Sequence, residues 1–235
     1  MTTEDRSPRP FWVDGLMLGF AGMVFITLVL LGNWQMRRLA WKLDLIETVN
    51  TRLNTDAVAA PVRVETSEDL TYRRVMATGE LQHDRSRQVK ALTELGAGYW
   101  LMTPLKTVDG HIWINRGFTP LGSVSTEWTS PSGLVDIEGV VRASEPGGTF
   151  LETNDPQAGR WFSRDVAALS ADSRTSNPAP YFIDADHYGA DTDWPRGGMT
   201  IVKFRNAHLS YALTWYAMAV LFLGALIWIV RDRLT

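Results

Sequence analysis

The sequence predicts a membrane protein in which two transmembrane α-helices bracket one β-rich extramembrane domain, either an antiparallel sandwich or an open barrel. Two observations predict the helices, because Gly15–Met36 and Leu209–Val230 each run for 22 residues without a charged side chain. A helix of that length spans about 33 Å, which matches the ~30 Å hydrocarbon core of a bilayer. A third observation predicts the domain, because short strand-like segments separated by turn-forming residues fill the chain between the two runs.

The segment boundaries follow from these runs. We expect an N-terminal tail at residues 1–14, membrane helices at 15–36 and 208–230, the domain at 37–207 and a C-terminal tail at 231–235. Aromatic residues at the ends of the runs, such as Trp34 and Trp228, are typical of the membrane interface. The first ten residues carry as many acidic as basic side chains, which is unlike a secretory signal or a transit peptide, so we expect an uncleaved anchor. Basic residues flank both ends of the runs, so the positive-inside rule leaves the orientation open.

The domain is expected to begin with a short amphipathic helix over Trp41–Leu53, whose apolar residues recur at helical spacing. Asp109-Gly110 predicts a hairpin with a type I′ turn, and Asn154–Gly159 and Asp172–Pro180 are rich in turn formers and predict loops. The predicted strands are Tyr72–Leu81, Arg87–Thr93, Tyr99–Thr107, His111–Phe118, Leu134–Ala143, Tyr181–Ala185 and Met199–Phe204.

Composition excludes several classes of function. The chain has no cysteine, which rules out disulfides, thiolate metal sites, covalent haem attachment and a cysteine nucleophile. A formal net charge of -3 argues against a nucleic-acid partner. None of the common hydrolase, metalloprotease or nucleotide-binding motifs occurs. No acidic residue stands out in an apolar context, so the sequence gives no positive indication of an enzyme.

The most informative residues lie where the two runs end beside the domain. Trp34, Gln35, Arg37 and Arg38 close the first run, and Arg205 and His208 open the second. If the two helices are antiparallel, these two groups lie at the same depth. His208, Ala212, Trp215 and Ala219 recur at helical spacing, which puts an imidazole above small residues on one face.

Two interpretations of this face remain open. An imidazole at the membrane surface suits a planar apolar ligand such as a haem, with His208 as the axial ligand of the iron. Arg37, Arg38 and Arg205 could then pair with the haem propionates, while Trp34, Gln35 and Trp215 line the site. The alternative is ordinary packing, because polar residues at helix ends often hydrogen-bond a neighbouring helix.

Six segments of the chain form a distinctive set: LGNWQMRRLAWK (Leu31–Lys42), YRRVMATGEL (Tyr72–Leu81), INRGFTP (Ile114–Pro120), EGVVRASEPGG (Glu138–Gly148), WFSRD (Trp161–Asp165) and FRNAHLSYALTWYAMA (Phe204–Ala219). In this order, they resemble the surfeit locus protein 1 family of cytochrome c oxidase assembly factors. Phe118 departs mildly from that pattern, because the family often has tryptophan at this position.

The resemblance implies a non-enzymatic assembly factor that matures subunit I of haem–copper oxidases. It implies binding of haem a through His208, receipt of that haem from haem A synthase, and help with its insertion into subunit I. It also implies a multi-pass protein of the inner membrane with its central domain in the periplasm. We expect a bacterial rather than a mitochondrial member, because a transit peptide is not evident.

Two other functions stay in view. The chain could be a scaffold that stabilises subunit I without touching haem, and its aromatic rim would then be a protein interface. It could also be a membrane-anchored enzyme, which would need a constellation of catalytic side chains that the sequence does not display.

Overall fold

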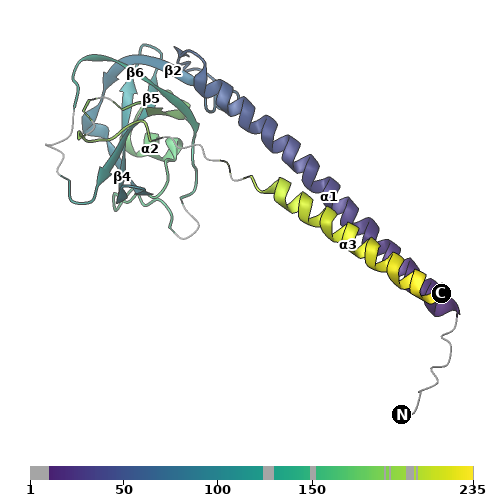
Figure 1. Ribbon diagram of the computed structural model, residues 1–235. Helices are drawn as coiled ribbons and strands as arrows, with labels where there is room; N and C mark the ends of the chain where they lie inside the picture. Colours follow the sequence, from purple (N-terminus) through teal and green to yellow (C-terminus); the bar gives the residue numbers. More distant parts are fainter. Residues whose placement is uncertain are drawn as a thin grey trace. The chain divides into compact units, whose positions relative to one another are not determined.

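The computed structural model describes residues 11–123, 130–148, 152–187, 189–190, 192–199, 204 and 206–234. The chain divides into two compact units: a helical unit from the two terminal segments, up to residue 47 and from residue 203, and a β-rich unit over residues 48–202. Two long apolar helices, α1 (Phe11–Asn54) and α3 (His208–Leu234), bracket the β-rich part in sequence (Figure 1). This order confirms the predicted fold class.

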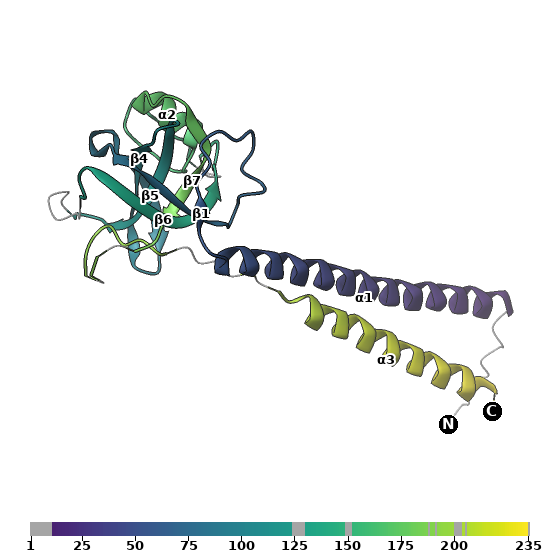
Figure 2. The ribbon, with the colours of Figure 1, turned by 90° about the horizontal axis from the view of Figure 1, so that it is seen from above.

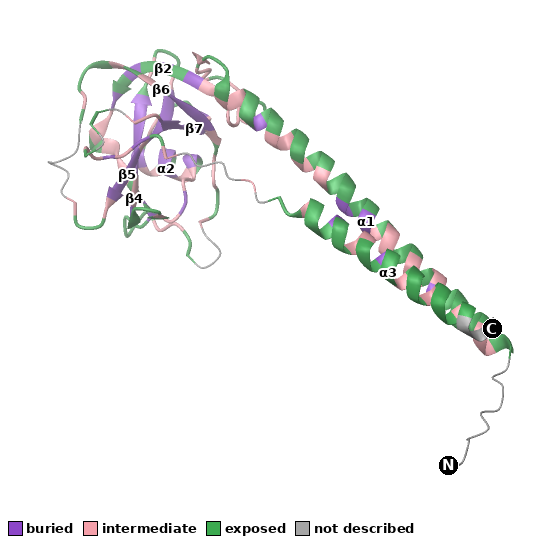
Figure 3. Ribbon diagram, viewed as in Figure 1, coloured by how far each residue is buried: buried purple, intermediate pink, exposed green. Residues whose placement is uncertain are grey.

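Both helices are long and apolar enough to cross a bilayer. Only 11% of the most apolar stretch of α1 and 6% of that of α3 are buried inside the protein, and the ribbon of both helices in Figure 3 is coloured mostly as exposed. A core helix of a soluble protein would be buried at these positions, so lipid is the environment that suits these surfaces. The exact membrane boundaries at 15–36 and 208–230 stay predictions.

Helix α1 is longer than predicted. Its 44 residues form one continuous helix, which includes the segment Trp41–Leu53 that the sequence suggested as a separate short helix. No proline or glycine occurs between Asn33 and Asn54, so nothing in the sequence interrupts the backbone hydrogen bonds there. At about 1.5 Å per residue, α1 is about 66 Å long, roughly twice the thickness of the hydrocarbon core.

The β-rich unit is a closed barrel-like sheet (Figure 2). The strand order is β1-β2-β6-β7-β5-β4-β3, and β2 also pairs with β4 through Glu80↔Lys106 and Leu81↔Leu105, which closes the sheet. Its elements are β1 (Val58–Ala59), β2 (Arg74–Leu81), the 3-10 turn η1 (His83–Arg85), β3 (Arg87–Thr93), β4 (Gly96–Lys106), β5 (His111–Pro120), β6 (Leu134–Ala143), α2 (Val166–Ser173) and β7 (Pro178–Ala185).

Six predicted strands are confirmed, two of them, β3 and β6, with identical bounds. The arrangement differs from a purely antiparallel sandwich or open barrel, because β5 and β7 pair in parallel and the β2–β4 contact closes the sheet. Most of the seventh predicted strand, Met199–Phe204, lies outside the described residues, and Met199 and Phe204 themselves are not in a strand.

Two local predictions need correction. The β4–β5 hairpin exists, but its turn is not type I′, since of Asp109 and Gly110 only Gly110 has a positive φ, 149°. The Thr107 hydroxyl organises this turn by accepting a hydrogen bond from Asp109 N and donating one to Gly110 O. The predicted loop Asp172–Pro180 overlaps the end of α2, a helix that begins where the Asp165 carboxylate accepts from Ala168 N at 3.1 Å.

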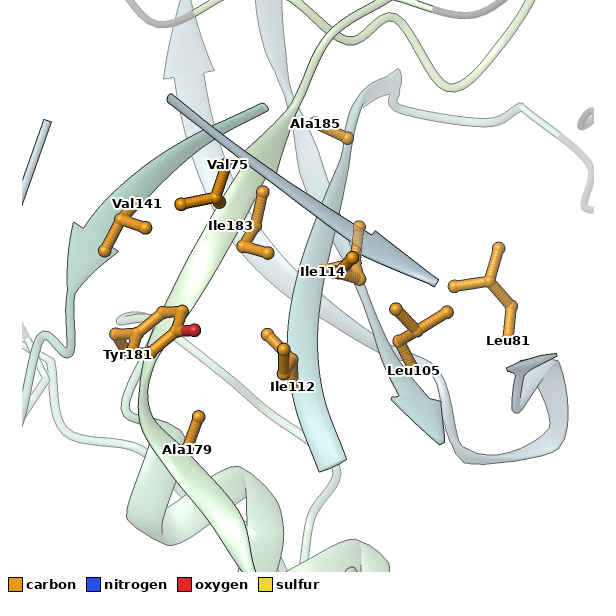
Figure 4. Close-up of a cluster of buried hydrophobic side chains, with 11 residues drawn as sticks. Val75, Leu81, Leu105, Ile112, Ile114, Val141, Ala179, Tyr181, Ile183 and Ala185 are labelled. Carbon is orange, nitrogen blue, oxygen red and sulfur yellow. The ribbon is translucent and has the colours of Figure 1, made fainter. Parts of the chain in front are cut away.

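Apolar side chains fill the barrel interior, and β4, β5 and β7 are buried over continuous stretches. β2 shows strict alternation of buried and exposed residues from Val75 to Leu81. Figure 4 shows one cluster converging from five strands, in which the Tyr181 hydroxyl donates to Pro61 O at 2.8 Å. A second cluster gathers around Trp113 and Trp161, so Trp161 is a core residue.

Candidate functional site

The helical unit is built on a seam of small residues between α1 and α3. Ala212 and Ala219 are buried on α3, and His208 and Trp215 on the same face are partly buried. Ala21, Gly32 and Gln35 are the buried positions on the membrane part of α1. Figures 1 and 2 both show α3 running antiparallel beside the N-terminal part of α1. The face predicted from helical spacing is therefore the face that α3 presents to α1.

Gly32 permits a close contact between the helices. A Cβ at this position would lie 2.5 Å from Cε1 of Tyr216, so the tyrosine ring packs directly on the glycine backbone. The Tyr216 hydroxyl reaches on to Asn33, donating to its Oδ1 at 2.7 Å. A Cβ at Gly15 or Gly19 would meet nothing within 4 Å. The GxxxG sequence near the other end of α1 is thus not part of this contact.

The imidazole of His208 is held by a second hydrogen bond across the seam. Its Nδ1 lies 2.8 Å from Oε1 of Gln35, which is buried. An amide oxygen can only accept, so Nδ1 is the donor of this hydrogen bond, and in the neutral imidazole the lone pair then lies on Nε2. Within the described residues, Nε2 has no hydrogen-bond partner. A neutral imidazole with one nitrogen anchored and the other open has the form of a metal ligand.

The other predicted site residues are distributed around this pair. Trp215 lies just under one helical turn after Ala212 on the seam, whereas Trp34 is 50% exposed and Arg37 is exposed. Arg38 stacks over the ring of Trp41, with 4.6 Å from Cζ to the ring centroid. Arg205 lies outside the described residues. The structure thus brings Gln35, His208 and Trp215 to one seam and leaves Trp34 and Arg37 on the outer surface.

Sequence reasoning missed a contact between the two segments above the seam. The ammonium group of Lys42 lies 4.7 Å from the ring centroid of Phe204. Both residues belong to segments that the sequence analysis singled out, but a cation–π pair across 162 positions leaves no pattern in the sequence.

The barrel carries charged groups that sequence reasoning also missed. Arg74 pairs with Glu138 and Asp186, and these hydrogen bonds raise the pKa of its guanidinium. Burial lowers the pKa of Arg116 to about 10, and its Nη1 contacts His83 Nδ1 at 3.2 Å. Asp184 is 8% exposed in the apolar strand β7, which corrects the expectation that no acidic residue sits in an apolar context.

Comparison with known proteins identifies the family. The sequence pattern of the SURF1 family matches residues 22–220. This range includes Gly32, Gln35 and His208 of the seam and the whole barrel. The chain belongs to the SURF1 family. It is 30% identical to Surfeit locus protein 1 of Mus musculus, covering 87% of this chain and 72% of that protein. The human protein of the same name is also 30% identical, over 84% of this chain and 72% of its own length.

A SURF1-like protein of Caenorhabditis briggsae is 32% identical over 97% of this chain and 78% of that protein. The resemblance drawn from the six sequence segments is therefore confirmed. SURF1 is known as a family of cytochrome c oxidase assembly factors and not as a family of catalysts. With two candidate spanning helices, this SURF1 chain is a membrane protein.

Proposed function

We propose that this protein binds haem a through His208 and assists its insertion into subunit I of a haem–copper cytochrome c oxidase. The observation that carries the proposal is the imidazole of His208, whose Nδ1 is anchored on Gln35 while Nε2 stays open. Histidines that bind metals almost always donate their other ring N–H to an oxygen acceptor. The donor set therefore fits an axial imidazole.

The residue types around His208 are ones that bind haem groups. Arg37 and Arg38 follow the seam on α1 and would pair with the two propionates, together with Arg205. Trp34 and Trp215 supply aromatic surface near the imidazole, and Gln35 acts on the haem through His208. Haem a is cargo in this proposal: it brings the redox-active iron that the oxidase needs, and the chain contributes a ligand, countercharges and a lipid-facing surface.

Transfer of haem requires that the complex also comes apart. One imidazole at the edge of an open helix pair gives an attachment that a recipient with two protein ligands can outcompete. We propose haem A synthase as the donor and subunit I as the recipient. We place the chain in a bacterial inner membrane with the barrel in the periplasm, so that haem is held at the outer surface of the bilayer.

A visible spectrum tests the proposal. The full chain is produced with and without haem A synthase, purified in detergent, and compared with His208→Ala. Tyr216→Phe is the matched control, because it removes the other hydrogen bond across the seam and leaves the imidazole in place. We expect a haem a spectrum in the wild type and in Tyr216→Phe that weakens strongly or shifts in His208→Ala.

Two other outcomes would overturn parts of the proposal. Pigment that His208→Ala leaves unchanged would retain haem binding and exclude His208 as the ligand. Colourless protein in every preparation, with oxidase assembly still dependent on the chain, would favour a scaffold that stabilises subunit I without haem. The packing of Tyr216 on Gly32 would then serve only to hold that scaffold together.

A further inference from the structure

Three of the segments that characterise this chain converge on one cavity in the barrel. The cavity has a volume of about 510 Å³, within the range of small-molecule sites. Asn115 and Gly117 come from the segment INRGFTP, Arg142 from EGVVRASEPGG and Arg164 from WFSRD. These residues are up to 49 positions apart in the sequence, and the proposed haem site uses none of them.

A buried network fixes the charges on one wall. The carboxylate of Asp184 accepts from Asn115 Nδ2 at 2.8 Å and from Arg164 Nη1 at 3.3 Å. Arg164 in turn holds both oxygens of Glu145 through Nε and Nη2, and its guanidinium lies 4.7 Å from the ring centroid of Phe182. Each of the three guanidinium nitrogens of Arg164 thus already donates to a carboxylate of the protein, so its role is to support Asp184.

Arg142 is the member of this network with binding capacity left. It donates to Asp184 only through Nη1, at 3.2 Å, and Tyr72 covers it with a ring 5.5 Å away. Within the described residues, its Nε and Nη2 donate to no protein acceptor. A guanidinium that lines a cavity, is held by one hydrogen bond and has further N–H donors can receive a carboxylate.

The remaining walls select the rest of the ligand. Trp100 and Met199 line the cavity, and Leu92 at its edge is 86% exposed. These side chains offer apolar contact beside the arginine.

We propose that this cavity binds a carboxylate that is attached to an apolar group, with Arg142 receiving the carboxylate and Trp100 and Leu92 contacting the apolar group. The site is separate from His208 and does not depend on haem binding. The same chemistry occurs in an acidic residue beside an apolar one in a protein segment and in a small aliphatic acid. The experiment below distinguishes these two sources.

Binding is measured by ligand-observed NMR on the full chain in nanodiscs, with empty nanodiscs as the blank. The peptide probe is acetyl-Leu-Glu-amide, compared with acetyl-Leu-Gln-amide, and the small-acid probe is hexanoate, compared with hexanamide. We expect saturable binding of at least one carboxylate probe, at least tenfold tighter than its amide. Tighter binding of the peptide assigns the site to a protein segment, and tighter binding of hexanoate assigns it to an aliphatic acid.

Variants locate the binding. Arg142→Gln should weaken the preferred probe at least tenfold, and Leu92→Ser should weaken it severalfold without affecting folding, because Leu92 is exposed. Arg63→Gln is the matched control, since it removes one exposed arginine of the same unit outside the cavity. Equal binding of acid and amide, or unchanged binding in a folded Arg142→Gln, would overturn the proposal, as would failure of both carboxylate probes to bind.

Discussion

Gln35 orients the imidazole of His208. A substitution of Gln35 therefore tests the orientation of the imidazole while the imidazole itself stays in place. Because the amide oxygen of Gln35 accepts from Nδ1, it fixes the tautomer that leaves Nε2 free. If His208 binds haem a, Gln35→Leu should weaken that binding by about 10–100-fold while histidine ligation persists. Titration of the apo-protein with haem a, followed by difference spectra, measures this. Gln35→Glu keeps an oxygen acceptor and should restore most of the affinity; equal affinities of Gln35→Leu and the wild type would exclude the positioning role.

Tyr181 gives the barrel a predictable dependence on alkaline pH. Burial raises the pKa of its phenol, whereas in the unfolded chain the group ionises near pH 10. The folded state then retains the proton that the unfolded state loses, so the contribution of Tyr181 to stability is complete below about pH 10 and declines as the pH rises above it.

Tyr181→Phe should remove that decline. At neutral pH it should also cost about 0.5–1.5 kcal/mol, because the hydrogen bond to Pro61 O is lost. Urea unfolding of the barrel, monitored by tryptophan fluorescence between pH 7 and 11, checks both parts. A wild type and a variant with parallel stability profiles across this range would show that Tyr181 does not titrate differently in the two states.

How well single residues could be predicted depended on whether they belong to a repeating pattern. His208, Ala212, Trp215 and Ala219 follow helical spacing, so their common face was visible in the sequence. Gln35, the partner of His208, was predicted only as one of several residues at the same membrane depth. A hydrogen bond between two helices leaves no periodic pattern in the sequence that would single out one of them. Asp184, Arg142 and Arg164 come from separate segments, so only the fold brings them together.

At the scale of elements, Gly32 sets the contact between α1 and α3, because the ring of Tyr216 lies against its backbone. Gly32→Leu should push the helices apart and break the Gln35–His208 hydrogen bond. Gly19→Leu is the matched control, since a side chain there meets open space. The chain has no cysteine, so spin labels attach only to cysteines introduced at the exposed positions Met23 and Val220.

The distance between these labels, measured by pulsed electron resonance, should lengthen in Gly32→Leu and stay unchanged in Gly19→Leu. An unchanged distance in both variants would show that the glycine is not the determinant of the contact.

Elements with strong local patterns were predicted well, and those defined by distant contacts were not. Strands β2 and β3 alternate buried and exposed residues because one face packs inward. The bounds of β3 and β6 were predicted correctly from strand-like segments between turn-forming residues. Helix α2 has eight residues, several of them turn formers, and its start depends on the Asp165 cap. The closing contact of the sheet consists of two residue pairs between β2 and β4, too few to leave a pattern in the sequence.

At the scale of the whole molecule, the chain consists of two compact units, and each carries one proposed site. The imidazole of His208 belongs to the helical unit, and the cavity at Arg142 belongs to the barrel. Each site is built entirely from the residues of its own unit, and none of the hydrogen bonds that define one site involves a residue of the other. Because sites without shared partners have nearly additive effects, each substitution should act on one site only.

This independence is tested by measuring each variant in the binding assay of the other site. His208→Ala should leave the affinity for the preferred carboxylate probe within about twofold of the wild type, and Arg142→Gln should leave the visible spectrum of the haem-loaded protein unchanged. Loss of carboxylate binding in His208→Ala, in protein with an unaltered melting temperature, would instead show that the two sites are coupled. The carboxylate affinity of the barrel would then depend on haem binding at His208, and haem affinity would depend equally on carboxylate binding, because a free-energy coupling between two sites acts in both directions.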